Sequence, residues 1–192
     1  LNRQEVNNML NNLRKTNETI VEDTVPALIS VSDLQKVLSN LLREGVPIRD
    51  LETILETLGD YAAAVKDTDM LTEYVRPALR RTCRSRFREA GQGKVITVDA
   101  QVENTIMNAG KKMEGGSYLS LEPDTIQSIV TAAGGQFDKV RDLVQTLLVL
   151  TSPIVRVYFK KLIDQFYPRV TVLSFNEIDT DIQIQALGNI SL

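Results

Sequence analysis

The sequence is poor in the residues that most catalytic and metal centres require. It contains no His and one Cys, Cys83, among 192 residues. Without His, the chain has no Ser-His-Asp or Cys-His catalytic group and no common His-ligated zinc site. A single Cys forms no disulfide within the chain and no Cys-rich metal centre. Because Cys83 continues the apolar series of Val75 and Leu79 at four-residue steps, we expect it to pack in a hydrophobic core.

Three further absences narrow the class of protein. There is no Trp, and the formal net charge is −3, so neither base stacking nor overall charge favours binding to nucleic acid. The longest apolar stretches, such as 146–151, are far too short to cross a bilayer, and no signal peptide is visible. The sequence also starts without an initiator Met, and we expect it to be a segment of a longer protein.

The residues that are present are typical of a globular protein, with 43% hydrophobic and 24% charged residues. The first ninety residues carry only helical patterns. Asn2 followed by Glu5 resembles a capping box, and Pro77 predicts a kink or a break because proline removes a helix hydrogen bond. We expect helices from Asn2, over 18–24, from Ser30 or Ser32 to Gly45, over 49–63, and from Asp67 or Thr68 to just before Gly91.

The pattern changes at Gly91-Gln92-Gly93, after which strands and helices alternate. The predicted fold class is therefore an N-terminal all-helical subdomain, 1–90, a linker, 91–93, and a small α/β subdomain, 94–192, with a four- or five-stranded sheet. We expect strands over 94–98, 118–121, 146–150, 170–173 and 182–186. We expect helices over 99–113, from 122–123, and over 152–166. Ile182, Ile184 and Ala186 alternate with Gln, which predicts one buried and one wetter face of the last strand.

Two series of like charges are the candidate binding residues. Acidic residues recur every fourth position at Glu52, Glu56 and Asp60, next to Arg49 and Asp50. Like charges four apart disfavour their own helix by roughly 0.2–0.5 kcal/mol per pair, so each series is better placed against the opposite sign. Either both series are solvated, or one meets another copy of the chain or a partner. The basic series consists of Arg76, Arg80, Arg84 and Arg88.

Two other motifs have simpler explanations. The Gly91, Gly93 and Lys94 group is a poor phosphate loop, because it follows a helix and opens a strand instead of the reverse. Ser152 and Pro153 lie at a strand-to-helix turn, and helix N-termini attract anions, with Arg156 one turn later; an ordinary capped helix of an α/β fold is the expected explanation. We therefore expect no cofactor.

Several segments, spread over nearly the whole chain, carry a family resemblance. They are IRDLETILETLGDY at 48–61, LTEYVR at 71–76, YLSLEPD at 118–124, VLSFNEI at 172–178 and IQIQALG at 182–188. In amino-acid sequence and in order along the chain, they resemble the C-terminal cytoplasmic region of the bacterial flagellar type III export-gate family (FlhA-like proteins), and specifically its last two subdomains.

The resemblance implies a protein that binds other proteins and is not an enzyme. It implies a ring of nine copies under the membrane gate, which receives export substrates with their chaperones and components of the export ATPase complex. The chain itself is then cytoplasmic, at the inner membrane of a bacterium, and reaches the membrane only through parts outside this sequence. In that ring the helical subdomain contributes to contacts between neighbouring copies. The candidate contact residues are Arg49, Asp50, Glu52 and Glu56.

Three alternatives remain open at this stage. One is a homologous gate component of a virulence secretion system, although the amino-acid sequence at 53–61 and 172–178 favours the flagellar branch. Another is a monomeric adaptor that binds one soluble partner. The third is an enzyme that works through a Ser or a carboxylate without His, which requires a deep pocket lined by converging ionisable groups.

Overall fold

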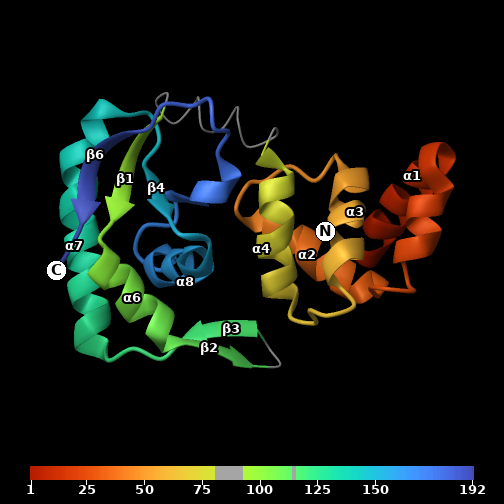
Figure 1. Cartoon of the computed structure of the whole chain (residues 1–192), viewed down its shortest axis with the longest axis horizontal. Coiled ribbons are helices and arrows are strands. Elements are labelled where there is room, and N and C mark those ends of the chain that lie inside the picture. The colour runs from red at the N-terminus through yellow and green to blue at the C-terminus, as the bar shows by residue number, and fades with distance from the viewer. Residues whose placement is uncertain (81–92, 114–115) are drawn as a thin grey trace. The chain divides into compact units, whose positions relative to one another are not determined.

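The computed structural model describes residues 1–80, 93–113 and 116–192 (Figure 1). It divides into two compact units, unit 1 from Leu1 to Thr82 and unit 2 from Cys83 to Leu192. The predicted linker, 91–93, falls largely outside the described residues, and so does Cys83 with its expected core position. The exact boundary between the subdomains therefore stays a prediction, and each unit is described by itself.

Unit 1 is all-helical in its described part, as the sequence predicts. The helices are α1 (Arg3–Thr24), α2 (Val31–Arg43), α3 (Leu51–Tyr61) and α4 (Thr68–Ala78). Each begins at a side-chain cap. The predicted capping box is present, since Asn2 Oδ1 accepts from Glu5 N at 2.8 Å and Glu5 Oε1 accepts from Asn2 N at 3.2 Å. Ser30, not Ser32, caps α2, and Gly45 follows that helix with φ of 74°. Such local caps supply partners for the first N–H groups of each helix.

Helix α1 bends at Asn17, whose φ of −148° and ψ of 78° are not helical. Asn17 Oδ1 accepts from Ile20 N at 3.2 Å, so Asn17 acts as an N-cap inside the helix. The sequence predicts two helices here, the second over 18–24. The structure instead joins them end to end with a kink at the residue that starts the second one.

Helix α4 stops where proline predicts a disruption. It ends at Ala78, one residue after Pro77, and Leu79 has left the helical region at φ −94° and ψ 14°. The continuation toward Gly91 lies outside the described residues. The core of unit 1 consists of apolar side chains at helical spacing from all four helices, including Leu10, Leu38, Leu55 and Val75.

Unit 2 contains a four-stranded parallel sheet, in agreement with the predicted α/β fold. Its strands are β1 (Lys94–Val98), β4 (Leu148–Thr151), β5 (Thr171–Ser174) and β6 (Gln185–Ile190), in the order β5-β4-β1-β6. The helices are α6 (Ala100–Ala109), α7 (Pro123–Val140) and α8 (Pro153–Asp164), with short 3-10 turns at Arg141–Leu143 and Phe175–Glu177. The three helices start where the sequence places them: the Asp99 side chain caps α6, and Pro123 and Pro153 begin α7 and α8 after Glu122 and Ser152.

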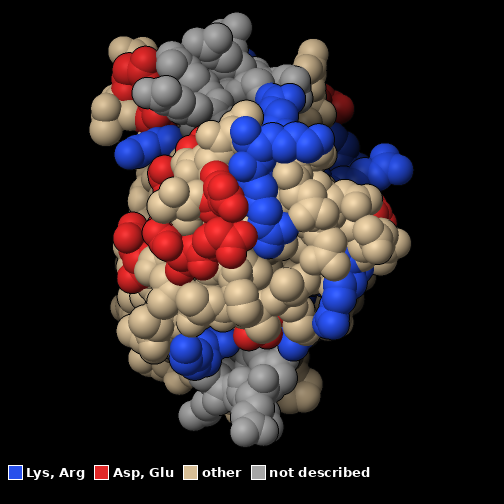
Figure 2. All heavy atoms as spheres, turned by 90° about the vertical axis from the view of Figure 1, so that its right-hand side faces the viewer, with Lys and Arg blue, Asp and Glu red and all other residues tan. Residues whose placement is uncertain are grey.

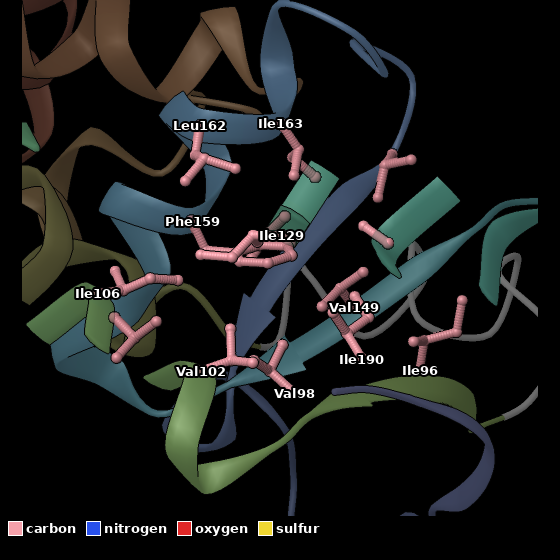
Figure 3. Packing of buried hydrophobic residues seen from close by; sticks show 14 of the residues in the cluster. Ile96, Val98, Val102, Ile106, Ile129, Val149, Phe159, Leu162, Ile163 and Ile190 are labelled. Atoms are coloured by element: carbon pink, nitrogen blue, oxygen red, sulfur yellow. The ribbon is translucent and has the colours of Figure 1, made fainter. Parts of the chain in front are cut away.

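The main core of unit 2 lies between one face of the sheet and helices α6, α7 and α8 (Figure 3). Ile96, Val149 and Ile190 from the strands pack there with Val102 of α6 and Phe159 of α8. The alternate strand residues Val95, Leu148, Leu150 and Leu173 form a smaller cluster on the opposite face. Ile178 and Ile182 pack on this second cluster, because the connection from β5 must return past the sheet to reach β6 at its other edge.

Two predictions for unit 2 are wrong in detail. The helix expected over 99–113 ends at Ala109, and Gly110–Met113 forms β2, which pairs with β3 (Gly116–Leu119) in a separate antiparallel hairpin. The last strand begins at Gln185, and Ile184 is 46% exposed, so the expected burial of Ile184 and Ala186 fails. Here β6 is an edge strand, and alternation of residue types overestimates its burial.

The opposite edge of the sheet is closed by side chains. Three backbone groups at or next to β5 make hydrogen bonds to side chains of the same chain. Arg156 Nη1 donates to Val172 O at 3.0 Å, Lys160 Nζ donates to Val170 O at 2.9 Å, and Ser174 N donates to Glu177 Oε2 at 2.7 Å. Arg156 and Glu177 are almost completely buried. Side chains thus take the positions that a further strand occupies at an open edge.

Candidate interaction surface

Helix α3 presents its acidic residues to solvent because its apolar residues all point inward. Asp50 starts the helix, with Oδ1 accepting from Thr53 N at 3.3 Å. Leu51, Ile54, Leu55 and Leu58 are buried at helical spacing. The exposed side carries Glu52, Glu56 and Asp60, and the preceding Arg49 and Asp50 are also exposed. The structure therefore brings all five predicted residues of this region to one accessible helix and the two residues that precede it.

Glu52 also makes a hydrogen bond within unit 1. Its Oε1 accepts a hydrogen bond of 2.6 Å from Asn17 Nδ2 at the kink of α1. The side chain of Asn17 thus caps the second half of α1 and reaches α3 at the same time. A charge-assisted hydrogen bond of this kind is stronger than a neutral one, so Glu52 helps to fix the bend of α1 against α3.

An open cleft of about 360 Å³ lies between α1 and the start of α3. Met9, Asn12 and Leu13 form the wall on α1, and residues 49–52 form the wall on α3. One wall is largely apolar and the other carries three charges. A cleft with this lining suits the side chains of a protein partner, because the apolar wall contributes burial and the charges select orientation.

The charges of unit 1 are also separated by sign on the surface. Figure 2 views the molecule from the side of α1, and shows acidic side chains gathered in a patch beside a stripe of Lys and Arg. One of the pairs that bridge opposite charges on α1 is Arg14 with Glu22, at 2.9 Å. Neighbouring patches of opposite sign allow two copies to meet with complementary charges.

The predicted basic series does not form one exposed stripe. Arg76 is 1% exposed, and its Nη1 lies 3.8 Å from Glu44 Oε1. The buried face of α4 is wide enough to include Thr72 and Arg76 beside Val75, which apolar patterning alone does not indicate. Arg80 is exposed. Arg84 and Arg88 lie outside the described residues, so their part of the prediction is untested.

The possible anion site at the start of α8 is occupied by the chain itself. Glu103 Oε2, on α6, accepts from Ser152 N at 3.0 Å and also from the Ser152 hydroxyl. The carboxylate takes the position at the helix N-terminus that an anion would take. Arg156 is buried and bonds to the β5 backbone instead of facing a ligand. Within the described ranges, no group of acidic or Cys side chains has the arrangement of a metal site.

Sequence reasoning missed the α1 side of the cleft and the bond from Asn17. Met9 and Leu13 follow the apolar pattern of α1, so they read as ordinary core residues, yet both are half-exposed. Asn17 carries a weak signal, since an Asn between two helical patterns suits a cap. Its partner on α3 is 35 positions away in the sequence, and only the fold brings the two together.

Comparison with known proteins decides the family. The model of the FHIPEP family matches residues 1–183. The chain belongs to the FHIPEP family. It is 38% identical, over its whole length, to the flagellar biosynthesis protein FlhA of Bacillus subtilis, of which it covers 28%. The resemblance to FlhA-like proteins that the sequence motifs predict is thereby confirmed, and the chain spans about a quarter of the length of the curated FHIPEP relatives it matches.

Solved structures of similar proteins share the fold of the whole chain. The complex of Chlamydia pneumoniae CdsV with CdsO matches with a TM-score of 0.86 at 34% identity, over 100% of this chain and 55% of that one. The nonameric EscV cytosolic domain from the type III secretion system matches with a TM-score of 0.81 at 30% identity, over 98% of this chain and 55% of that one. Among the described residues of this FHIPEP chain, none of the helices is both long and apolar enough to cross a membrane.

The bond between Asn17 and Glu52 predicts a measurable loss of stability. Glu52→Ala leaves Asn17 without its acceptor, and we expect the free energy of unfolding to fall by about 0.5–1.5 kcal/mol in urea titrations of the chain. Glu56→Ala is the matched control, since it removes an exposed carboxylate one turn later on the same helix. Equal effects of the two substitutions would contradict a role for Glu52 in holding the kink.

Proposed function

We propose that the chain is the docking part of a bacterial type III protein export gate. In this role it lies on the cytoplasmic side of the inner membrane, assembles with further copies into a nonameric ring, and binds proteins without making or breaking bonds. Its partners are chaperones with their export substrates and components of the export ATPase complex. The observation that carries the proposal is the similarity of nearly the whole chain to the nonameric EscV cytosolic domain.

The surface of unit 1 supports assembly through charge and shape. The cleft lies between α1 and the start of α3, and the carboxylates of Glu52 and Glu56 are exposed on α3. On the side of the molecule that faces the viewer in Figure 2, patches of opposite sign stand next to one another. A head-to-tail contact between such surfaces leads to a closed ring when the rotation between copies closes. Exposed ion pairs contribute at most about 1 kcal/mol each, so they set orientation more than affinity.

The flagellar branch is the specific form of the proposal, supported by 38% identity to FlhA. A gate component of a virulence secretion system is the second candidate, supported by the similarity to CdsV, whose structure with CdsO also supports binding of a further protein. Restoring motility in a bacterium that lacks its own flagellar gate protein separates the two. Secretion restored only in a virulence system would favour the second candidate.

Reversal of charge on α3 tests the ring. In the complete protein, Glu52→Lys with Glu56→Lys is expected to weaken association between copies at least about tenfold, because the new charges face surfaces matched to carboxylates. Sedimentation of the purified protein measures the association, and protein export from cells measures the consequence. The variant Glu52→Ala measures the contribution of Glu52 to stability separately.

The control changes the net charge equally at another place. Asp138 and Asp142 are exposed on unit 2, and Asp138→Lys with Asp142→Lys is expected to leave association unchanged. Unaltered assembly and export in the α3 variant would remove the interface from α3 while leaving the fold as described.

A further inference from the structure

Two exposed tyrosines of unit 1 stack on one another. Tyr61 is the last residue of α3, and Tyr74 lies in α4. Their ring centroids are 4.3 Å apart and their planes differ by 5°. Each side chain is 39% exposed, and among the described residues neither hydroxyl takes part in a hydrogen bond. The pair is thus a partly exposed, stacked aromatic surface, and within the described residues its two hydroxyl groups make no hydrogen bond.

The fold does not need this pair in order to join α3 and α4. Ile54 and Leu58 of α3 and Leu71 and Val75 of α4 are buried in the core of unit 1 and already hold the helices together. Exposed aromatic side chains are enriched at protein interfaces, because they offer a large contact area at a small cost in conformational entropy. The pair therefore has the character of an anchor point for a partner.

The two helices that carry the pair are predominantly acidic, and Lys66, the one basic residue in the segment between them, donates to Ala62 O at 2.9 Å. Helix α3 contains three acidic and no basic residues, and α4 contains two acidic residues and one Arg, Arg76, which is buried. Asp60 precedes Tyr61, is exposed, and makes no ion pair or hydrogen bond within the described part of the chain. Arginine fits better than lysine, because its planar guanidinium stacks on an aromatic ring and pairs with a carboxylate at the same time.

The direction of the pair points away from the proposed contact between copies. With 100° per residue, Tyr61 lies about 140° around α3 from Glu56, and Asp60 lies between them. A neighbouring copy that docks on Glu52 and Glu56 therefore leaves the tyrosines accessible. The assignment to a separate partner therefore rests on the proposed function, in which Glu52 and Glu56 contact a neighbouring copy.

We propose that Tyr61, Tyr74 and Asp60 form a docking site for an exposed arginine of a protein other than this chain. The guanidinium stacks on the outer side of the tyrosine pair, and Asp60 supplies the opposite charge. The site takes basic segments and rejects acidic ones, because the carboxylates of α3 and α4 repel them.

The test uses short capped peptides of the sequence Gly-Arg-Gly-Arg-Gly and the chain with labelled tyrosine rings. In NMR titrations, the arginine peptide is expected to shift the signals of Tyr61 and Tyr74 selectively among the five tyrosines. The same peptide with Lys is expected to bind about two- to fivefold more weakly, and the peptide with uncharged citrulline is expected to cause no shift. Equal shifts with all three peptides, or none at Tyr61 and Tyr74, would overturn the proposal.

Variants identify the groups and the occupant. Asp60→Asn is expected to weaken binding of the arginine peptide about two- to fivefold, while Asp142→Asn leaves it unchanged. Tyr61→Leu, checked for an unchanged fold by circular dichroism, is expected to abolish the shift of Tyr74. If Tyr61→Leu with Tyr74→Leu instead dissociates copies of the complete protein, the occupant is a second copy and the proposal fails. The Glu52 and Glu56 reversal does not alter these residues, so its failure is distinguishable.

Discussion

Gly93→Ala is expected to destabilise unit 2 by about 3 kcal/mol or more. Gly93 has a φ of +93°, which costs a residue with a Cβ roughly 1–3 kcal/mol. A Cβ at this position would also overlap the carbonyl oxygen of Gln183 and lie 3.2 Å from its carbonyl carbon. Since the obstacle is backbone, the loop before β6 must move, and overpacking of this kind typically costs a further 1–3 kcal/mol.

The same substitution threatens the register of the sheet. Gln185 N donates to Gly93 O at 2.8 Å, and Lys94 pairs with Gln185 immediately afterwards. Displacement of residue 183 therefore disturbs the first bond between β1 and β6. Urea unfolding followed by circular dichroism measures the loss. Lys94→Ala, at the neighbouring position, is the control, and a cost at Gly93 no larger than the cost at Lys94 would show that the close approach is unimportant.

Gly134→Ala is expected to lower the free energy of unfolding by about 1–3 kcal/mol, although alanine is the better helix former. Gly134 is buried in α7, and its Cβ would overlap the hydroxyl of Tyr167 and lie 3.3 Å from Tyr167 Cζ. The Tyr167 ring cannot easily turn away, because it packs edge-on against Phe137 with centroids 5.0 Å apart.

The next residue provides the matched control. Gly135 is exposed in the same helix, and a Cβ there meets nothing within 4 Å. Gly135→Ala is expected to stabilise the chain by about 0.5–1 kcal/mol through helix propensity alone. Adding Tyr167→Phe to Gly134→Ala is expected to recover part of the loss, because it removes the overlapping hydroxyl. Opposite signs at positions 134 and 135 are the result that thermal unfolding should show.

Much of the fold could be predicted because local signals were strong. Asn2 with Glu5, Ser30, Gly45 and Pro77 each act on neighbouring residues, so the sequence places the helix ends of unit 1 well. The continuous apolar run that becomes β4 is buried on both faces, as its composition predicts. These features require no knowledge of distant contacts.

The errors occur where pairing or packing with another segment decides, whether that segment is near or distant in the sequence. Residues 110–113 continue a helical pattern, but pairing with 116–119 makes them a strand. Arg76 belongs to a series of regularly spaced arginines, yet the packing of α4 buries it beside Glu44. Glu52, Glu56 and Asp60 are exposed as predicted. The strong apolar face of their own helix is buried, which leaves the opposite face to solvent. The bond from Glu52 to Asn17 depends on tertiary structure and could not be predicted.

The side chains that close β5 have a consequence for association between copies of the chain. Strand addition at that edge would have to break the bonds from Arg156, Lys160 and Glu177 and expose two buried charges. Crowded copies are thereby discouraged from joining their sheets into a continuous ribbon at this edge. Association through exposed helix surfaces does not require these bonds to break, so it is the easier route for contacts between copies.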